Sequence, residues 1–215
     1  MGVSCLHQLF LNHSSSHLHT ATLFGIAVAV VTLALILLYL NGFDAVAALR
    51  DGWSNDKPEA GLISNIGVFL MGIASLSAMF WGYRHKRLPL LALGVFCGLF
   101  ALDDALLLHE RLGRREIIVF VMYGIFLIYI LIAFTRQNGG RVVWPLIYTF
   151  AAFGASVVID VAWGPLLDTT GMQFSQWPLE RIGYCLEDIP KFGGIVLLSS
   201  LAIGEVGSLK PSVSR

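Results

Sequence analysis

Six runs of about 20 mainly apolar residues constrain the fold of this chain more than any other feature. A run of about that length is enough to cross a bilayer as an α-helix. The runs lack period-two alternation and are too long for strands. They cover roughly residues 20–41, 62–83, 88–110, 116–135, 143–165 and 181–204. The sequence therefore predicts an all-α integral membrane bundle of six transmembrane helices.

The composition supports a membrane protein. Hydrophobic residues make up 56% of the chain and charged residues only 13%, with a mean hydropathy of +0.75. Ordinary soluble domains carry about 25% charged residues, so this chain has too few to cover a water-facing surface. The formal net charge is zero, which gives no reason to expect nucleic acid as a partner. The partner that the composition indicates is the lipid bilayer.

We expect one transmembrane domain over residues 20–205, between a His- and Ser-rich leader (1–19), predicted to be flexible, and a short tail (206–215). An even number of crossings places both termini on one side of the membrane, here called side A, opposite side B. Side A carries seven Lys and Arg residues and side B six. By the positive-inside rule, this small excess predicts that side A, with both termini, faces the cytoplasm.

The acidic residues are shared much less evenly between the two sides. Of the fourteen Asp and Glu residues, only Glu205 belongs to the side-A half. At a rise of about 1.5 Å per residue, Asp103 lies roughly 22 Å along its helix from side A, and Asp160 about 25 Å along another. Glu187 lies about 10 Å into the last helix from side B. Separate helices therefore bring carboxylates to a common depth beneath side B.

We interpret this layer as a polar cavity shared by several helices, because a charge near the bilayer centre costs about 2.5–3.5 kcal/mol even on lenient scales. The alternative is a set of ion pairs and interfacial anchors that orient the bundle. The candidate catalytic residues are Asp103, Asp104, His109, Glu110, Asp160, Glu187 and Asp188. The candidate substrate-binding residues are Asn65, Arg111 and Lys191.

A metal is one candidate cofactor for this cavity. Carboxylates with a histidine suit the divalent transition metals Fe, Mn or Zn, and the candidate ligands are Asp104, His109 and Glu187. Against a metal, the paired E-x-x-H signature of soluble di-iron bundles and the H-E-x-x-H motif are both absent from the sequence. These sequence patterns do not identify the cofactor.

The last helix has local features of its own. Glu187 and Lys191 are spaced i,i+4, the preferred order for an ion pair on one helix. Pro190 removes a backbone donor and favours a kink near Leu186. The glycine pair at 193–194 allows a neighbouring helix to approach closely.

Three segments together resemble a broad group of uncharacterised bacterial integral membrane proteins. The segments are "SNIG" at 64–67, "LDDALLLHERLG" at 102–113 and "LEDIPKFGG" at 186–194. Members of the group pair an SN-x-G opening with an LD(D/E)…HER segment and a late ED-x-x-K-F segment. The resemblance implies a multi-pass protein of the bacterial inner membrane, and it implies no activity. Its motif positions here are Asn65, Asp103, Asp104, His109, Glu110, Arg111, Glu187, Asp188 and Lys191.

The leading functional hypothesis is an enzyme that acts on a lipid or another apolar substrate entering from the bilayer. One alternative is an accessory or cofactor-binding subunit of a larger membrane complex, and an oligomer or complex is compatible with either hypothesis. A second alternative is a proton-coupled carrier, since buried acids, His and Lys form proton relays. The side-A halves of the helices are almost uninterrupted apolar sequence, and a carrier needs access from both sides. We therefore rank the carrier below the enzyme.

Overall fold

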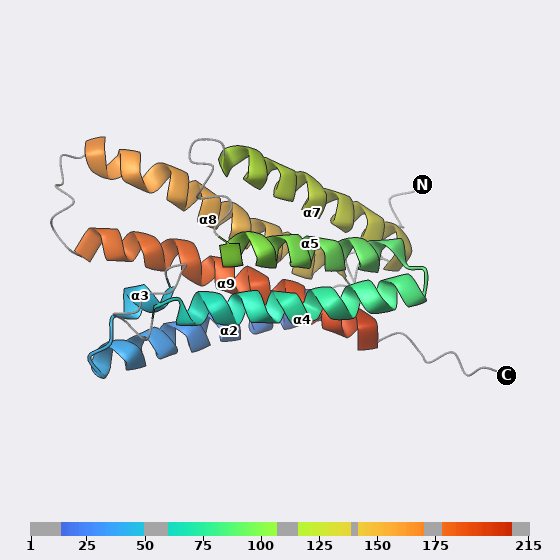
Figure 1. The fold of residues 1–215 in the computed structure, drawn as a ribbon, viewed down its shortest axis with the longest axis horizontal. Helices are drawn as coiled ribbons and strands as arrows, with labels where there is room; N and C mark the ends of the chain where they lie inside the picture. Colours follow the sequence, from blue (N-terminus) through green and yellow to red (C-terminus); the bar gives the residue numbers. More distant parts are fainter. Residues whose placement is uncertain (1–13, 50–59, 107–115, 139–141, 170–177, 208–215) are drawn as a thin grey trace.

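The structure is a computed structural model that describes residues 14–49, 60–106, 116–138, 142–169 and 178–207. All elements in these ranges are helices (Figure 1). Their bounds are α2 Ser14–Leu40, α3 Ala45–Leu49, α4 Leu62–Arg84, α5 Leu88–Leu106, α7 Glu116–Asn138, α8 Val143–Thr169 and α9 Pro178–Gly207. The predicted all-α fold is confirmed for these residues. Residues 14–19 of the predicted leader belong to α2. Residues 1–13 of the leader and residues 208–215 of the predicted tail lie outside the described ranges.

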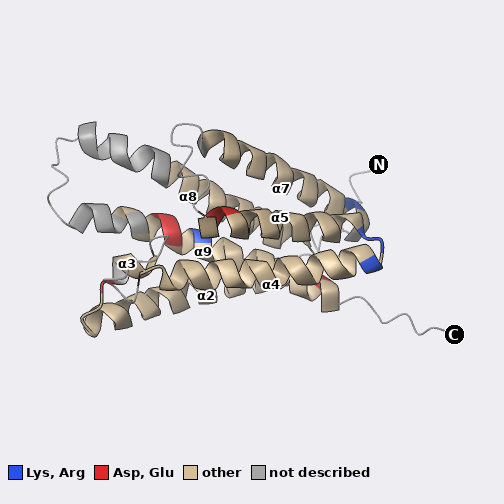
Figure 2. Ribbon diagram, viewed as in Figure 1, with Lys and Arg blue, Asp and Glu red and all other residues tan. Residues whose placement is uncertain are grey.

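The long helices run side by side along the long axis of the molecule (Figure 1). The turn between α4 and α5 and the end of α9 lie at one end, which corresponds to side A. The short helix α3 lies toward the other end, side B. Figure 2 shows most of the described Lys and Arg residues at the side-A end, whereas Asp and Glu on α5 and on the first half of α9 lie further toward side B. Lys191 and Glu205 also belong to α9, and Glu205 lies near its side-A end.

Within the described residues, five helical segments are long and apolar enough to cross a membrane. They are Leu18–Leu40, Leu62–Arg84, Leu88–Leu106, Ile117–Gln137 and Cys185–Gly207. In α8 the described apolar part, Val143–Ile159, is shorter. These helices indicate a multi-pass membrane protein, while the sixth crossing stays a prediction.

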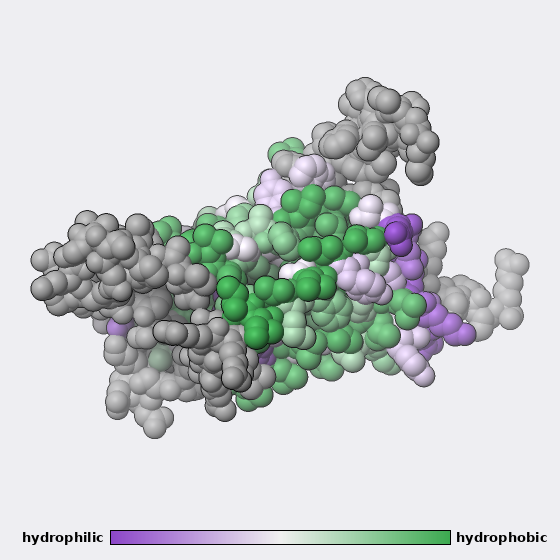
Figure 3. Space-filling model, turned by 90° about the horizontal axis from the view of Figure 1, so that it is seen from above, coloured by the Kyte–Doolittle hydropathy of each residue, from purple (hydrophilic) through white to green (hydrophobic). Residues whose placement is uncertain are grey.

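The outer surface of the bundle suits lipid. Large apolar side chains such as Phe69, Leu76 and Met122 are well exposed. Figure 3 shows hydrophobic residues over the middle of one face and hydrophilic residues at the end that holds the α4–α5 turn. Contiguous exposed apolar surface of this kind marks a region that contacts something other than water.

The closest helix packing lies between α4 and α5. A Cβ atom added to Gly82 would lie 2.6 Å from the backbone nitrogen of Leu91, and one added to Gly94 would lie 2.7 Å from that of Met79. Only glycine lets the two backbones approach this far. Phe96 and other fully buried side chains fill the adjoining core.

The glycine pair of α9 makes the close contacts that the sequence predicts. A Cβ atom on Gly193 would lie 2.6 Å from the ring of Phe24 in α2, and one on Gly194 would lie 2.8 Å from the ring of Phe153 in α8. The helix is continuous through Pro190. Thus α9 packs against α2, α4 and α8 at once, and it carries its polar residues into the centre of the bundle.

The helix α7 is peripheral by comparison. Its buried apolar side chains, Leu127, Ile130 and Phe134, form one stripe with helical spacing. Residues on the opposite side, such as Ile125 and Ile132, are exposed. Among the described helices, α7 packs mainly against α5 and α8.

Candidate functional site

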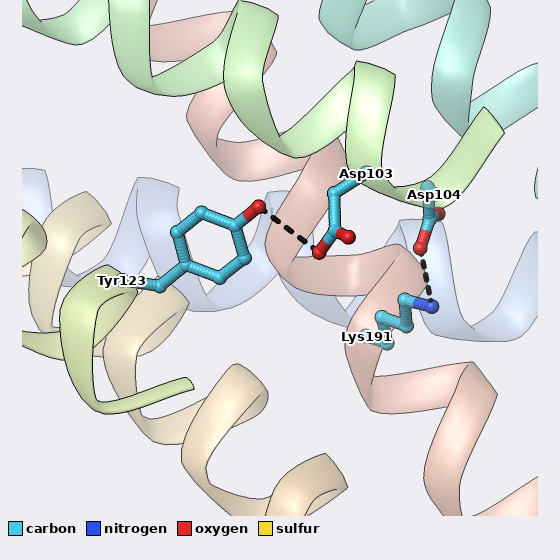
Figure 4. A network of polar contacts seen from close by, with 4 residues as sticks. All are labelled: Asp103, Asp104, Tyr123 and Lys191. Atoms are coloured by element: carbon cyan, nitrogen blue, oxygen red, sulfur yellow. Dashed lines mark hydrogen bonds and ion pairs between the residues drawn. The ribbon is translucent and has the colours of Figure 1, made fainter. Parts of the chain in front are cut away.

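Both aspartates near the end of α5 are buried. Asp103 is 5% exposed and Asp104 is 6% exposed. Consecutive residues on an α-helix point about 100° apart, so the two side chains can reach different neighbouring helices. α5 contacts α7 on one side and α9 on another, and each aspartate faces one of these helices (Figure 4).

Asp103 is bound by a tyrosine of α7. The hydroxyl of Tyr123 donates a hydrogen bond to Oδ2 of Asp103 at 2.9 Å. Tyr123 lies seven residues after Glu116, the first residue of α7, which places it about 10 Å along that helix from side B. Tyr123 is not among the site residues predicted from the sequence. The feature that could have indicated it is a hydroxyl group within an apolar run, at the same depth as the aspartates.

Asp104 forms an ion pair with Lys191 of α9. The Nζ atom of Lys191 lies 2.8 Å from Oδ1 of Asp104, and the side chains are 15% and 5% exposed. Such a bond between two charged groups is stronger than a neutral one, and it joins α5 to α9 (Figure 4). The sequence predicted a pair between Lys191 and Glu187 of the same helix; the structure adds a partner from another helix.

A cavity of about 360 Å³ lies among α5, α7, α8 and α9. Its polar lining includes Asp103, Asp104, Glu187 and Lys191, which lie toward side B. The rest of the wall is mainly apolar and aromatic. The aromatic lining residues are Phe100, Phe120, Tyr123, Phe150 and Phe153.

The aromatic wall is ordered by ring packing. The rings of Phe100 and Phe153 stack with centroids 4.8 Å apart and an interplanar angle of 9°. Tyr123 lies beside Phe100, with centroids 5.6 Å apart. The tyrosine therefore connects the aromatic wall to the carboxylate of Asp103, because its ring belongs to one and its hydroxyl binds the other.

The cavity reaches the lipid-facing surface between α7 and α8. Among its lining residues, Ile117 and Val121 of α7 and Val158 of α8 are more than half exposed. Two lining glycines, Gly124 and Gly154, have no atom within 4 Å of an added Cβ. Exposed apolar side chains of α7 and α8 therefore border the described part of the cavity.

A second, much smaller cavity of about 20 Å³ adjoins the ion pair. Its polar lining comes from Ser64 of α4, Asp104 of α5, and Asp188 and Lys191 of α9. A space of this size holds about one water molecule, and four polar side chains could bind it. The helix that opens with the "SNIG" segment therefore reaches the same polar layer.

Asn65, the residue after Ser64, lines neither cavity. Its Nδ2 atom donates a hydrogen bond to the carbonyl oxygen of Gly61 at 2.7 Å. Its proposed contact with a substrate stays a prediction.

The structure brings together some of the predicted site residues. Asp103, Asp104, Glu187 and Lys191 line one cavity, and Asp188 lines the adjoining one. His109, Glu110 and Arg111 lie outside the described residues. Asp160 belongs to α8, but its side chain is also outside the described part.

The predicted metal set stays untested as a whole. Within the described residues, no group of three or more His, Cys, Asp or Glu side chains is arranged to hold a metal ion. Asp104 and Glu187 line the same cavity, while their proposed partner His109 is outside the described residues. The described side chains give a metal site no support.

The helices and the cavity define the class: a multi-pass α-helical membrane protein that encloses charged side chains between its helices. The chain belongs to the family described as a domain of unknown function (DUF8692), whose sequence model matches residues 22–203. No curated protein and no solved structure matched the chain. The family agrees with the resemblance to an uncharacterised group, and the activity must be argued from the site.

Proposed function

We propose that this chain is an integral membrane enzyme that binds a lipid or another apolar molecule in the cavity and acts on its polar end. One observation carries the proposal: the cavity combines an aromatic wall, an approach from the lipid-facing surface, and carboxylates in its polar lining. Ligand sites are typically apolar cavities with a few convergent polar groups.

Acid–base chemistry is the chemistry that these side chains support. Asp103 and Glu187 are carboxyl groups lining the same cavity, and a positioned carboxyl group can accept or donate a proton at a reacting atom. The Tyr123 hydroxyl orients Asp103. The Lys191 ammonium orients Asp104 and offers a positive charge beside the polar end of the ligand.

The remaining predicted residues fit the mouth of this site. His109, Glu110 and Arg111 follow the end of α5 at Leu106 by only a few positions, and Asp188 lines the small cavity behind the ion pair. We assign His109, Glu110 and Arg111 to the side-B mouth, and Asp188, Asp160 and Asn65 to the polar groups that surround the cavity.

We also propose six crossings, with side A in the cytoplasm of a bacterial inner membrane. In α8, Val143–Ile159 would form most of the sixth crossing. Arg84, Lys86, Arg87 and Arg136 are the described basic residues of side A (Figure 2), and positive charge favours the cytoplasmic face. Fusing a periplasmic-only reporter enzyme after residue 207 tests the topology: activity of that reporter would overturn it.

Native mass spectrometry of the purified chain tests whether the cavity holds an apolar molecule. Gly154→Leu and Gly124→Leu each add side-chain volume to the lining of the cavity, and a Cβ atom at either position has no neighbour within 4 Å. Gly25→Leu in α2 is the matched control, since Gly25 also has open space around it and does not line the cavity.

We expect a bound apolar adduct on the wild type and on Gly25→Leu, and its loss from both cavity variants. Equal adduct occupancy in all four proteins would show that the molecule binds elsewhere and would overturn the proposal. Replacing Asp103 by Asn should abolish conversion while part of the adduct stays bound, because Asp104 and Glu187 remain in the lining.

A further inference from the structure

We infer that the molecule bound in the cavity is a hydrophobic organic cation, an apolar body that carries an amine or a quaternary ammonium group. This inference rests on the proposed function and names its substrate class. It follows from three properties of the cavity: the sign of its lining charges, its aromatic faces and its size.

The lining charges favour a positive occupant. Asp103, Asp104 and Glu187 supply three carboxylates, and Lys191 supplies one ammonium group. When all four are ionised, the described part of the lining has a formal excess of two negative charges. Asp188, next to the ion pair in the small cavity, has the same sign. Because charges interact more strongly away from water, an anionic occupant would be repelled and a cationic one attracted.

The aromatic wall favours the same ligand. Phe100, Phe120, Tyr123, Phe150 and Phe153 all line the cavity. The face of an aromatic ring carries partial negative charge and attracts a cation within about 6 Å, most strongly where water is excluded. Aromatic residues also bind the apolar body of the ligand by burial. Carboxylates alone would suit any small cation; the combination selects a hydrophobic one.

The cavity also has a suitable size and position. Its volume of about 360 Å³ lies within the range of roughly 300–1,000 Å³ seen for small-molecule sites. Its exposed lining residues, Ile117, Val121 and Val158, face the region where a lipid would lie. An amphiphilic cation concentrates in that region, so it would reach the cavity from the bilayer.

Two ions of matched size and opposite charge test the inference. Radiolabelled tetraphenylphosphonium and tetraphenylborate are added to the full chain in nanodiscs of digalactosyldiacylglycerol, an uncharged bilayer lipid that has no amine. Specific binding is the difference between wild-type and Gly154→Leu nanodiscs, because this difference cancels partitioning of each ion into the lipid. Gly25→Leu should bind like the wild type.

We expect specific binding of tetraphenylphosphonium that is at least about tenfold tighter than that of tetraphenylborate, since like charges brought together are costly. Glu187→Gln should weaken it, and Lys191→Gln should strengthen it in whatever fraction stays folded, because the two changes shift the cavity charge in opposite directions. Equal or tighter binding of tetraphenylborate would overturn the inference.

The cation could be a free hydrophobic amine or the amine of a lipid headgroup. Repeating the measurement with phosphatidylethanolamine in the nanodiscs separates these sources, because that lipid competes only if its headgroup enters the cavity. Phosphatidylglycerol, which has no amine, is the control. Either result keeps the cationic class and identifies its source.

The inference and the proposed function fail differently. Suppose that the native adduct disappears in Gly154→Leu but that neither probe distinguishes the wild type from this variant. The cavity then still binds an apolar ligand, as the proposed function requires, but that ligand is not a cation. If the adduct itself is unaffected by Gly154→Leu, the cavity is not the binding site and both are wrong.

Discussion

The interface between α4 and α5 and the interface between α7 and α8 both contain glycines, but these glycines serve opposite purposes. At Gly82 and Gly94, a Cβ atom would lie under 3 Å from the backbone of the facing helix. At Gly124 and Gly154, a Cβ atom would have no neighbour within 4 Å. The first pair draws two helices together; the second leaves space beside a cavity.

This difference divides the bundle into two parts. The α4–α5–α9 part is closely packed around buried side chains such as Met71, Phe96 and Leu198. The part beside α7 and α8 is open and lined by exposed residues. The polar side chains lie between the two, on the cavity-facing sides of α5 and α9. A rigid part can therefore position charged groups for a ligand that enters through the open part.

The largest expected effect comes from the ion pair at the boundary of the two parts. Lys191→Met should lower the free energy of unfolding by about 3–5 kcal/mol, because it leaves the buried carboxylate of Asp104 without its ammonium partner. Unfolding in mixed detergent micelles, followed by circular dichroism, measures this change.

The double variant Lys191→Met, Asp104→Leu is the control for this first prediction. Replacing both charges of a buried pair by apolar groups is often neutral or stabilising, so the double variant should recover most of the loss. A double variant that is less stable than Lys191→Met alone would show that Asp104 is stabilised by other groups.

The next effect concerns the hydrogen bond across the cavity. Tyr123→Phe removes the hydroxyl that donates to Asp103 and keeps the ring against Phe100. We expect a loss of about 1.5–3 kcal/mol, the range for hydrogen bonds to charged groups. The same denaturation experiment measures it, with Tyr129→Phe in the same helix as control because Tyr129 is exposed. Equal stability of the two variants would contradict a structural role for the Tyr123 hydroxyl.

The two kinds of glycine environment predict effects of opposite sign on the free energy of unfolding. Gly94→Ala should destabilise by about 1–3 kcal/mol, because the added methyl group forces the α4 and α5 backbones apart. Gly154→Ala should be neutral or stabilise by up to about 1 kcal/mol, because alanine favours a helix and the space is open. Thermal unfolding of the two variants in the same detergent measures both changes in stability. If both lose the same stability, the two interfaces are equally packed and the comparison is wrong.

How far the sequence predicted this structure depends on whether a feature is local. The runs 62–83 and 88–110 predicted helices that the structure bounds at Leu62–Arg84 and Leu88–Leu106, because length and hydropathy alone define a crossing. The common depth of Asp103 and Glu187 also followed from counting residues along helices. Such counting depends only on the regular rise of a helix.

Features that depend on helix neighbours were not predictable from the sequence. Helical spacing suggested Glu187 as a partner of Lys191, and the structure adds Asp104 from across the bundle, which the spacing does not indicate. Which aspartate faces which helix depends on α5 lying between α7 and α9, and nothing in a single sequence gives this order. Tyr123 was missed for the same reason: its hydroxyl gains significance only once α7 is beside α5.

The smallest effect is expected at the side-A end, where a second ion pair offers a comparison with the buried one. Arg87 lies 3.9 Å from Glu205, and its side chain is 42% exposed, against 15% for Lys191 in the buried pair. Exposed ion pairs contribute about 0–1 kcal/mol, since water screens the charges and both side chains lose freedom. Arg87→Ala should therefore change the free energy of unfolding by less than about 1 kcal/mol, and raising the salt concentration should remove most of that change. If Arg87→Ala lowered the free energy of unfolding as much as Lys191→Met in the same detergent, the ion pair at side A would stabilise the bundle as strongly as the buried pair. The two ends of the bundle would then not differ in the contribution of their ion pairs.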